Sequence, residues 1–437
     1  MTNRPGSYSQ RDITESEKLA LRAGSVIPGI SQTFSKNPNQ YVRKITPAFI
    51  ERGQDGHVWD ADGNEYIDYP LSLGPIILGH GDPDVTAAVK DQLDDGTIFS
   101  LPHRLEVEVS ELLCEIIPCA EMVRFGKNGS DATSAAIRAA RSFTGRDRVA
   151  ICGYHGWQDW YIGTTTRDSG VPKAVAELSH RFTYNDIASL ENLFQEHPGE
   201  IACVIIEPVS IESPDDDFLQ KVAELTRANG ALLIFDEVIT GFRLSLGGAQ
   251  ELYGVTPDLA CFAKAMANGY PISAVVGRGD VMNQFEKVFF SGTFGGEALS
   301  LAAAKATINK MQREPVIERL WEVGGKLQTT YNQIAGDLGL ASITSCQGLA
   351  PHTVTPFFDA SGSASLPLRS LLQQELALRG ILYLVGFNVC YSHTDEDVDI
   401  TIKALRESLT VVAEAVQNGS VEELLKGPAA EAVFRRQ

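Results

Sequence analysis

The segment Ala-Leu-Leu-Ile-Phe-Asp-Glu-Val, residues 231–238, decides the fold of this chain. It places a continuous apolar run directly before two acids, and similar apolar runs occur at residues 148–153, 201–208 and 272–277. Such runs are typical of strands that are buried on both faces of a sheet. Because helical patterns alternate with them between residues 84 and 310, the sequence predicts an α/β core with a mainly parallel sheet.

The segments on either side of this core predict a second, smaller domain. Residues 12–23 have apolar positions at helical spacing, and residues 48–68 have the pattern of short strands around tight turns. We therefore predict an N-terminal arm and part of the small domain over residues 1–69, a large domain over residues 70–320, and the C-terminal part of the small domain over residues 321–437.

Composition restricts the class of protein. The 437 residues are 43% hydrophobic and 21% charged, as in ordinary globular proteins, and the formal net charge is -19. A nucleic-acid binder needs Lys and Arg clusters, and none stands out, so we expect no nucleic-acid partner. The sequence has neither a bilayer-length apolar stretch nor an apolar leader, so we expect a cytoplasmic protein with no membrane partner. The seven cysteines lack a CxxC pair and are predicted to be reduced, mostly buried thiols.

Two strand ends carry the residues that we expect to do chemistry. Asp236 and Glu237 end the run at 231–238, and ligands collect at the carboxyl ends of strands in such sheets. Lys264 follows a second apolar run, at what should be a buried turn. A buried lysine favours its neutral amine, which can form an imine with an aldehyde, and a nearby carboxylate can keep a pyridine nitrogen protonated. The alternatives are a strand end that meets solvent for the acids and a solvated lysine for Lys264.

A turn upstream could bind a phosphate group. Residues 125–132 form a short strand that breaks at a glycine and opens a helix, so that free backbone N–H groups lie beside the Ser130 hydroxyl. An ordinary helix with Ser130 or Asp131 as its N-cap is the alternative. Tyr154 follows another predicted strand at the same edge of the sheet, where it could stack on a flat ring or serve only as a structural aromatic.

Over nearly its whole length the chain resembles the class III (subgroup II) aminotransferases that use pyridoxal phosphate (PLP), especially their glutamate-1-semialdehyde 2,1-aminomutase-like branch. The motifs occur in the family order and include KNGSD at 127–131, GYHGWQD at 153–159, DEVITGFR at 236–243 and SGTFGGE at 291–297. The resemblance implies the fold type I architecture of PLP-dependent transferases, with a large domain around a mainly parallel central sheet and a smaller α+β domain.

The resemblance also implies roles for single residues. Lys264 would carry PLP as a Schiff base and move a proton between the substrate and the cofactor, while Asp236 would pair with the ring nitrogen. Thr293 would reach the phosphate of the neighbouring subunit, which implies a homodimer with shared active sites. Val238 and Tyr154 would contact the two faces of the cofactor ring, and Gly129 and Ser130 would contact its phosphate. Glu207 matches an acid of the family that lies near the cofactor.

Departures from the aminomutase pattern help to choose an activity. The segment after GYHG is shorter than the gating loop of aminomutases, and their substrate-binding arginine is not evident at residues 28–35. Aminomutases also carry a glutamate before a C-terminal His-Thr motif, and it is not evident at residues 384–394. The glutamine that the family commonly has shortly after the Glu-Pro pair at 207–208 is missing at residues 209–212. We therefore predict an aminotransferase that moves an amino group from a small-molecule amine donor to a ketone or aldehyde acceptor in a ping-pong cycle.

Two other readings stay open. One is glutamate-1-semialdehyde 2,1-aminomutase, in which the amino transfer is intramolecular, and the other is a catalytically silent family member that serves as a binding subunit. The eight histidines show no ligand spacing with cysteines or acids, so we predict no metal site.

Overall fold

The structure is a computed structural model that describes residues 4–433. The described residues form two compact units. The terminal unit joins the residues up to Asp82 with those from Glu318 onward, and the central unit runs from Pro83 to Ile317. The corresponding divisions predicted from the sequence are 69/70 and 320/321.

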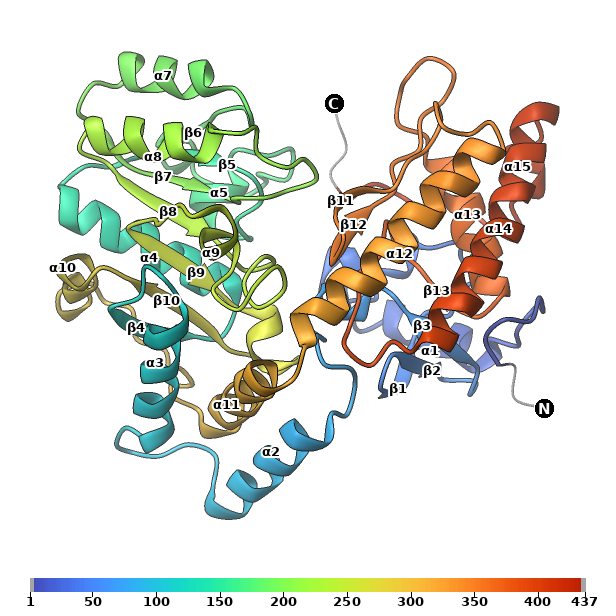
Figure 1. Cartoon of the computed structure of the whole chain (residues 1–437), viewed down its shortest axis with the longest axis horizontal. Helices are drawn as coiled ribbons and strands as arrows, with labels where there is room; N and C mark the ends of the chain where they lie inside the picture. Colours follow the sequence, from blue (N-terminus) through green and yellow to red (C-terminus); the bar gives the residue numbers. More distant parts are fainter. Residues whose placement is uncertain (1–3, 434–437) are drawn as a thin grey trace. The chain divides into compact units, whose positions relative to one another are not determined.

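The central unit is built around a seven-stranded sheet in the order β4-β10-β9-β8-β7-β5-β6 (Figure 1). The pairs from β6 to β9 are parallel, whereas β10 runs antiparallel to both of its neighbours. The prediction of an α/β fold with a mainly parallel sheet is therefore confirmed, and the run at 272–277 supplies the one strand of reversed direction. The strands are Met122–Gly126 (β4), Arg148–Cys152 (β5), Ser179–Arg181 (β6), Ile201–Ile206 (β7), Leu232–Asp236 (β8), Leu259–Phe262 (β9) and Ser273–Gly277 (β10).

Helices cover this sheet and bury its central strands. Every residue of β7, β8, β9 and β10 is buried, as expected for strands with protein on both faces. Helix α4 (Gly129–Thr144) packs against β7, β9 and β10, and its buried face is rich in alanine, which lets helix and sheet approach closely. The other helices of this unit are α2 (Pro83–Asp95), α3 (Arg104–Ile116), α5 (Asp159–Ile162), α6 (Lys173–Ala176), α7 (Ile187–Glu196), α8 (Phe218–Ala228), α9 (Ala249–Tyr253), η4 (Lys264–Ala267), α10 (Gly279–Met282), η5 (Asn283–Glu286) and α11 (Ala298–Arg313).

The terminal unit contains a four-stranded sheet in the order β1-β2-β3-β13. The first three strands form the antiparallel meander expected at 48–68, and β13 adds to β3 in parallel. The strands are Ile50–Gln54 (β1), His57–Asp60 (β2), Glu65–Asp68 (β3) and Ile381–Leu382 (β13), with a separate hairpin of Gln347–Leu349 (β11) and His352–Val354 (β12). The helices are α1 (Thr14–Gly24), η1 (Phe34–Lys36), η2 (Pro38–Gln40), η3 (Leu71–Leu73), α12 (Val316–Asp337), α13 (Leu366–Leu378), α14 (Asp395–Asn418) and α15 (Val421–Leu424).

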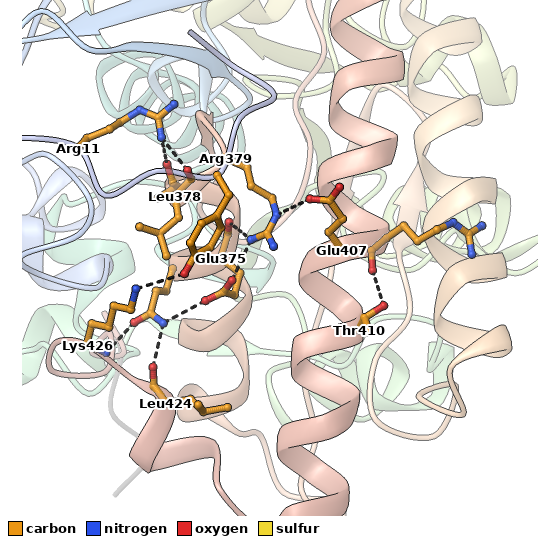
Figure 2. Close-up of polar contacts among 12 residues, drawn as sticks. Arg11, Glu375, Leu378, Arg379, Glu407, Thr410, Leu424 and Lys426 are labelled. Carbon is orange, nitrogen blue, oxygen red and sulfur yellow. Dashed lines mark hydrogen bonds and ion pairs between the residues drawn. The ribbon is translucent and has the colours of Figure 1, made fainter. Parts of the chain in front are cut away.

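Polar contacts at the end of α13 hold the terminal unit together, as Figure 2 shows. Arg11 donates a hydrogen bond of 2.9 Å to the carbonyl oxygen of Leu378, one of the carbonyls that a helix end leaves without an intrahelical partner. Arg379 lies 2.8 Å from Glu375 and 2.9 Å from Glu407 of α14. Segments from both ends of the chain are therefore fixed to one helix.

The cysteines agree with the sequence analysis. All seven cysteines are free, and six of them are buried, as predicted. Within residues 4–433, each helix is either too short or too polar to cross a membrane.

Candidate active site

Lys264 lies two residues after the end of β9 and is the first residue of the short helix η4. Its φ of +45° is in the left-handed region, which residues with a side chain rarely adopt. Its Nζ atom makes no hydrogen bond or ion pair with any residue of the described chain. Burial lowers the pKa of Lys264, although Glu207 and Asp236 act in the opposite direction. A lowered pKa favours the neutral amine that a nucleophilic lysine needs.

Asp236 is the last residue of β8, the strand beside β9, and two groups hold its carboxylate. Its Oδ2 atom lies 2.8 Å from Nδ1 of His155, and both side chains are buried. Its Oδ1 atom accepts a hydrogen bond of 3.1 Å from the backbone N–H of Val238. The orientation of the carboxylate is therefore fixed on both oxygens.

The second ring nitrogen of His155 is also held. Nε2 lies 3.1 Å from the carbonyl oxygen of Cys152, which can only accept, so Nε2 carries a proton. The ring is therefore fixed at both nitrogens, and it fixes in turn the position of the Asp236 carboxyl group that faces Nδ1.

Glu207 follows β7 and faces the same group of residues. Its Oε2 atom accepts a hydrogen bond of 2.8 Å from the backbone N–H of Tyr154. Burial raises the pKa of Glu207 to about 7, and the charge of Asp236 acts in the same direction. Gly153 makes this approach possible, because a Cβ atom there would lie 2.5 Å from Oε2 and the φ of Gly153 is +114°.

The first turn of α4 has the features that a phosphate site requires. The backbone N–H groups of Gly129 and Ser130 make no hydrogen bond with any residue from 4 to 433. The helix begins at Gly129 with Asn128 as its N-cap, and Asp131 reaches back to accept from the N–H of Asn128 at 2.8 Å. The alternative that Ser130 or Asp131 is the N-cap is therefore wrong, because both lie inside the first helical turn.

Two glycines let other parts of the site reach this helix start. A Cβ atom on Gly156 would lie 2.1 Å from Oγ of Ser130, and the next residue, Trp157, donates its N–H to that oxygen at 3.2 Å. A Cβ atom on Gly129 would lie 3.0 Å from both methyl groups of Val238. The loop after β5 and the end of β8 thus meet at the start of α4.

The remaining two predicted residues are more exposed. Tyr154 is 51% exposed, and its ring stands edge-on to Tyr161 with 5.4 Å between the ring centres. Thr293 is exposed in the segment before α11 and makes no hydrogen bond with the described residues. The structure thus brings Lys264, Asp236 and Glu207 together, as their electrostatic influence on one another shows, and it does not join Thr293 to them.

Three residues of this region were missed or left unassigned by the sequence analysis. The sequence analysis takes His155 only as a possible metal ligand. Its place between an aromatic residue and a glycine, just after a predicted strand, could have indicated a residue of the site. Arg243 is buried, and its charge contributes to the lowered pKa of Lys264. Lys127 forms an ion pair of 3.0 Å with Glu297, the N-cap of α11. Nothing local in the sequence predicts this last pair, because its partners are far apart in the chain.

The second acid of the β8 end has a structural role. Glu237 is buried, and its carboxylate accepts hydrogen bonds from the backbone N–H groups of Ala249 at 2.7 Å and Gln250 at 2.9 Å. These are N–H groups of the first turn of α9, which have no intrahelical acceptor. The carboxylate of Glu237 therefore serves to hold the start of α9.

This arrangement fits a pyridine aldehyde that carries a phosphate. It offers an amine without a partner, a buried carboxyl group held in place by a histidine, and free N–H groups at a helix start beside a hydroxyl. Among residues 4–433, His, Cys, Asp and Glu side chains nowhere gather in a group of three or more that could hold a metal ion.

Comparisons with known proteins agree with this assignment. Residues 39–348 match the family model described as aminotransferase class-III. The chain is 37% identical over 411 residues to a 3-aminobutyryl-CoA aminotransferase from Cloacimonas acidaminovorans, with 92% of this chain and 98% of the relative covered. It is 35% identical over 435 residues to a glutamate-1-semialdehyde 2,1-aminomutase from Roseiflexus castenholzii, with 92% and 99% covered. The solved structure of a PLP form of the FumI protein from Sphingopyxis sp. MTA144 has a TM-score of 0.86 at 28% identity, with 92% of this chain and 98% of that chain covered.

Proposed function

Because this chain belongs to the class III aminotransferases, we propose that it transfers the amino group of a β-amino acid, or of its thioester, to a ketone or aldehyde acceptor. Its activity as a PLP-dependent aminotransferase is that of the family, as the sequence predicted. The unpartnered amine of Lys264, beside the Asp236–His155 pair, is the observation that supports placing this activity at these residues.

Each residue of the site has a proposed task. PLP, when bound, supplies a conjugated ring that accepts the electron pair of the substrate carbon. Lys264 would bind the aldehyde carbon and, once released, move a proton at the substrate carbon. Asp236, held in place by His155, would pair with the proton of the ring nitrogen. The proposed contacts to the phosphate are Gly129 and Ser130, those to the ring faces are Val238 and Tyr154, and Glu207 is proposed to lie near the cofactor.

The identity of the donor rests on two arguments. A relative named for a 3-amino acyl thioester is 37% identical to this chain over nearly its whole length. In addition, residues 28–35 contain no arginine, so this segment offers no guanidinium for the carboxylate of a small α-amino acid. Both arguments favour an amino group on the β carbon. An aminomutase relative also matches, and it remains the second candidate.

A half-reaction screen tests the donor. The purified enzyme would be mixed with 3-aminobutyrate, 3-aminobutyryl-CoA, β-alanine or glutamate, without an acceptor, and the visible absorption of the PLP form would be followed. We expect fast bleaching with the β-amino compounds and slow bleaching with glutamate. Rapid isomerisation of glutamate-1-semialdehyde without a second substrate would overturn the proposal in favour of the aminomutase.

We propose that the enzyme is a homodimer with shared active sites. Phe99 and Leu101 precede α3 and are 46% and 80% exposed, and Phe294, beside Thr293, is 59% exposed. The two segments lie side by side, because the N–H of Ala298 donates to the carbonyl oxygen of Thr97 at 2.8 Å. A second copy would cover this apolar surface and bring Thr293 to the partner's phosphate site.

Subunit mixing tests the shared site. Lys264→Ala and Thr293→Val homodimers are each expected to have little activity. A mixed dimer of the two would contain one site with both changes and one site with neither, so activity should return toward half of the wild-type value per dimer. If mixing restores nothing while sedimentation shows mixed dimers, Thr293 does not act across subunits.

The cytoplasm is the proposed location. Seven free thiols and no disulfide among residues 4–433 support a reducing compartment.

A further inference from the structure

The segment that carries Thr293 depends on its two ends for its shape. Residues 291–296 have the sequence Ser-Gly-Thr-Phe-Gly-Gly, and glycine has more conformational freedom than any other residue. Thr293 and Phe294 are exposed, so neither anchors the segment in the core of the central unit. The N–H of Gly295 donates to the carbonyl oxygen of Gly292 at 3.0 Å, which is a turn within the segment itself. The residues on either side therefore set the position of Thr293.

The end before this segment is fixed to β4 and α4. Arg124 of β4 donates to the carbonyl oxygen of Phe290 at 3.0 Å, and Arg138 of α4 donates to that of Phe289 at 3.0 Å. The ring of Phe290 also packs against the buried core of the central unit. This end thus lies against the strand and the helix on either side of residues 127–130, which we call the phosphate turn.

The end after the segment is held by a side chain of the phosphate turn. Nζ of Lys127 lies 3.0 Å from Oε2 of Glu297 and donates to Oγ of Ser300 at 3.3 Å. The two charged side chains are mostly buried, with 19% and 16% exposed. As the N-cap of α11, the carboxylate of Glu297 also accepts from the N–H groups of Leu299 at 2.7 Å and Ser300 at 3.2 Å. Lys127 therefore connects the phosphate turn to the start of α11.

The pair is charged at neutral pH, and the turn itself does not depend on it. Burial alone would raise the pKa of Glu297, but hydrogen bonds from Ser300 and Lys127 lower it, so the carboxylate stays ionised. The backbone of the turn has its own support, because the N–H groups of Lys127 and Asn128 donate to Oδ2 of Asp131 at 3.1 Å and 2.8 Å. Loss of the Lys127 side chain should therefore disturb the segment of Thr293 more than the phosphate turn.

We propose that Lys127 positions Thr293 for the cofactor of the neighbouring subunit. By holding Glu297, its ammonium group fixes the segment that presents the Thr293 hydroxyl to the partner's phosphate. The inference rests on the proposed homodimer with shared active sites. It makes Lys127 a positioning residue that acts across the subunit interface, although it stands in the phosphate turn of its own subunit.

Mixed dimers with a single reporting site test the direction of this effect. One subunit carries Lys264→Ala, so only the other subunit's site shows the visible absorption of the imine, and dialysis against graded PLP gives its dissociation constant. With Lys127→Met on the Lys264→Ala subunit, we expect this constant to rise about three- to tenfold, as for a weakened hydrogen bond to a charged group. With Lys127→Met on the reporting subunit, we expect a constant close to that of wild type.

The same design separates this inference from the shared site on which it rests. Thr293→Val on the Lys264→Ala subunit should raise the dissociation constant at the reporting site about tenfold. If it does not, the shared site fails and this inference fails with it. If Thr293→Val acts across subunits but Lys127→Met has no effect, or acts only on its own subunit's site, Lys127 does not position Thr293 and the shared site stands.

Two further variants distinguish positioning from a general loss of stability. Lys305→Met removes another lysine–glutamate pair of α11, with Glu108 at 2.7 Å, and should leave the dissociation constant unchanged. Glu297→Gln keeps an acceptor at the helix start but loses the ion pair, so adding it to Lys127→Met should have little further effect. Equal rises with Lys305→Met and Lys127→Met, or additive effects of Lys127→Met and Glu297→Gln, would overturn the proposal.

Discussion

Nδ1 of His155 lies 2.8 Å from Oδ2 of Asp236, and both side chains are buried. The other nitrogen of the same ring is held by the carbonyl oxygen of Cys152, at the end of β5. Strand β5 thus supports a carboxylate that stands at the end of β8, with β7 between the two strands. The position of Asp236 therefore depends on a residue that need not touch the substrate.

Replacing His155 with Asn should lower turnover without abolishing it. The buried carboxylate of Asp236 would lose its hydrogen bond to the imidazole, which costs about 1.5–3 kcal/mol and corresponds to about 10- to 100-fold in rate. Because the ring nitrogen acts in both half-reactions, kcat/KM should fall by a similar factor for donor and acceptor. Stopped-flow measurement of each half-reaction checks this. A change in KM for one substrate alone, with unchanged kcat, would argue against a positioning role.

Removing the amine of Lys264 should abolish both turnover and the visible absorption of the imine. Reduction of the wild-type enzyme with borohydride, followed by proteolysis and mass spectrometry, should place the cofactor on the peptide that contains Lys264. The control is Lys90→Ala, at an exposed position of α2, which should leave absorption and activity unchanged. Cofactor found on another lysine would refute the assignment.

Parts of this site could be predicted because they depend on local sequence. An apolar run followed by Asp236, and a second run followed by Lys264, place both residues at strand ends whatever the details of the fold. The reversed direction of β10 could not be predicted, because a fully buried run has the same pattern in parallel and antiparallel neighbours. The role of His155 depends on a contact across 81 residues of chain. The N-cap at Asn128 depends on backbone angles, and several neighbouring residues were equally suitable.

Adding a methyl group at Gly156 should weaken PLP binding. The new Cβ would lie 2.1 Å from Oγ of Ser130, so the loop after β5 must move away from the start of α4. Gly170→Ala is a matched control, because Gly170 also has a positive φ but nothing lies within 4 Å of an added Cβ. Both variants should lose about 1–2 kcal/mol of stability from the left-handed backbone. Only Gly156→Ala should raise the dissociation constant for PLP, measured by equilibrium dialysis.

The pair His57–Asp397 should stabilise the terminal unit within a limited range of pH. Burial alone would raise the pKa of Asp397, but hydrogen bonds from His57 and Thr394 lower it to about 2, and Asp397 with Glu65 raises the pKa of His57 despite burial. The contribution of Asp397 is present above its unfolded pKa of about 4 and is lost as the pH falls toward 2. The contribution of His57 is present below about 6.5 and is lost as the pH rises through its raised value.

The stabilisation by this pair is therefore largest between about pH 4 and 6.5. The change Asp397→Asn should lower Tm most at a pH near 5.5, by the equivalent of about 1 kcal/mol after solvent screening is allowed for, and less at pH 3 and pH 8. Asp399→Asn removes a carboxylate from the same helix, but that group is 70% exposed and pairs with an exposed lysine. It should change Tm little at any pH. Equal effects of the two changes across the pH range would contradict the prediction.

Glu207 should make the central unit less stable as its carboxyl group ionises. Its folded pKa of about 7 lies above the ordinary value of about 4.3, because burial and the charge of Asp236 disfavour the ionised form. Between these two values the unfolded chain has already lost the proton that the folded chain keeps, so stability falls as the pH rises from about 4.3 to 7 and then levels off. Glu207→Gln removes the titrating group and keeps the shape of the side chain.

Scans of Tm against pH, made on the Glu207→Gln variant and on wild type, measure this effect. The wild type should lose Tm relative to the variant as the pH rises from about 5 to 7, and the difference should then stay constant. Glu212→Gln is the control, since Glu212 is an exposed acid a few residues along the chain and should leave the curve of the wild type unchanged. A difference between Glu207→Gln and wild type that did not vary between pH 5 and 7 would mean that Glu207 is ionised throughout, in which case it could not exchange a proton at neutral pH.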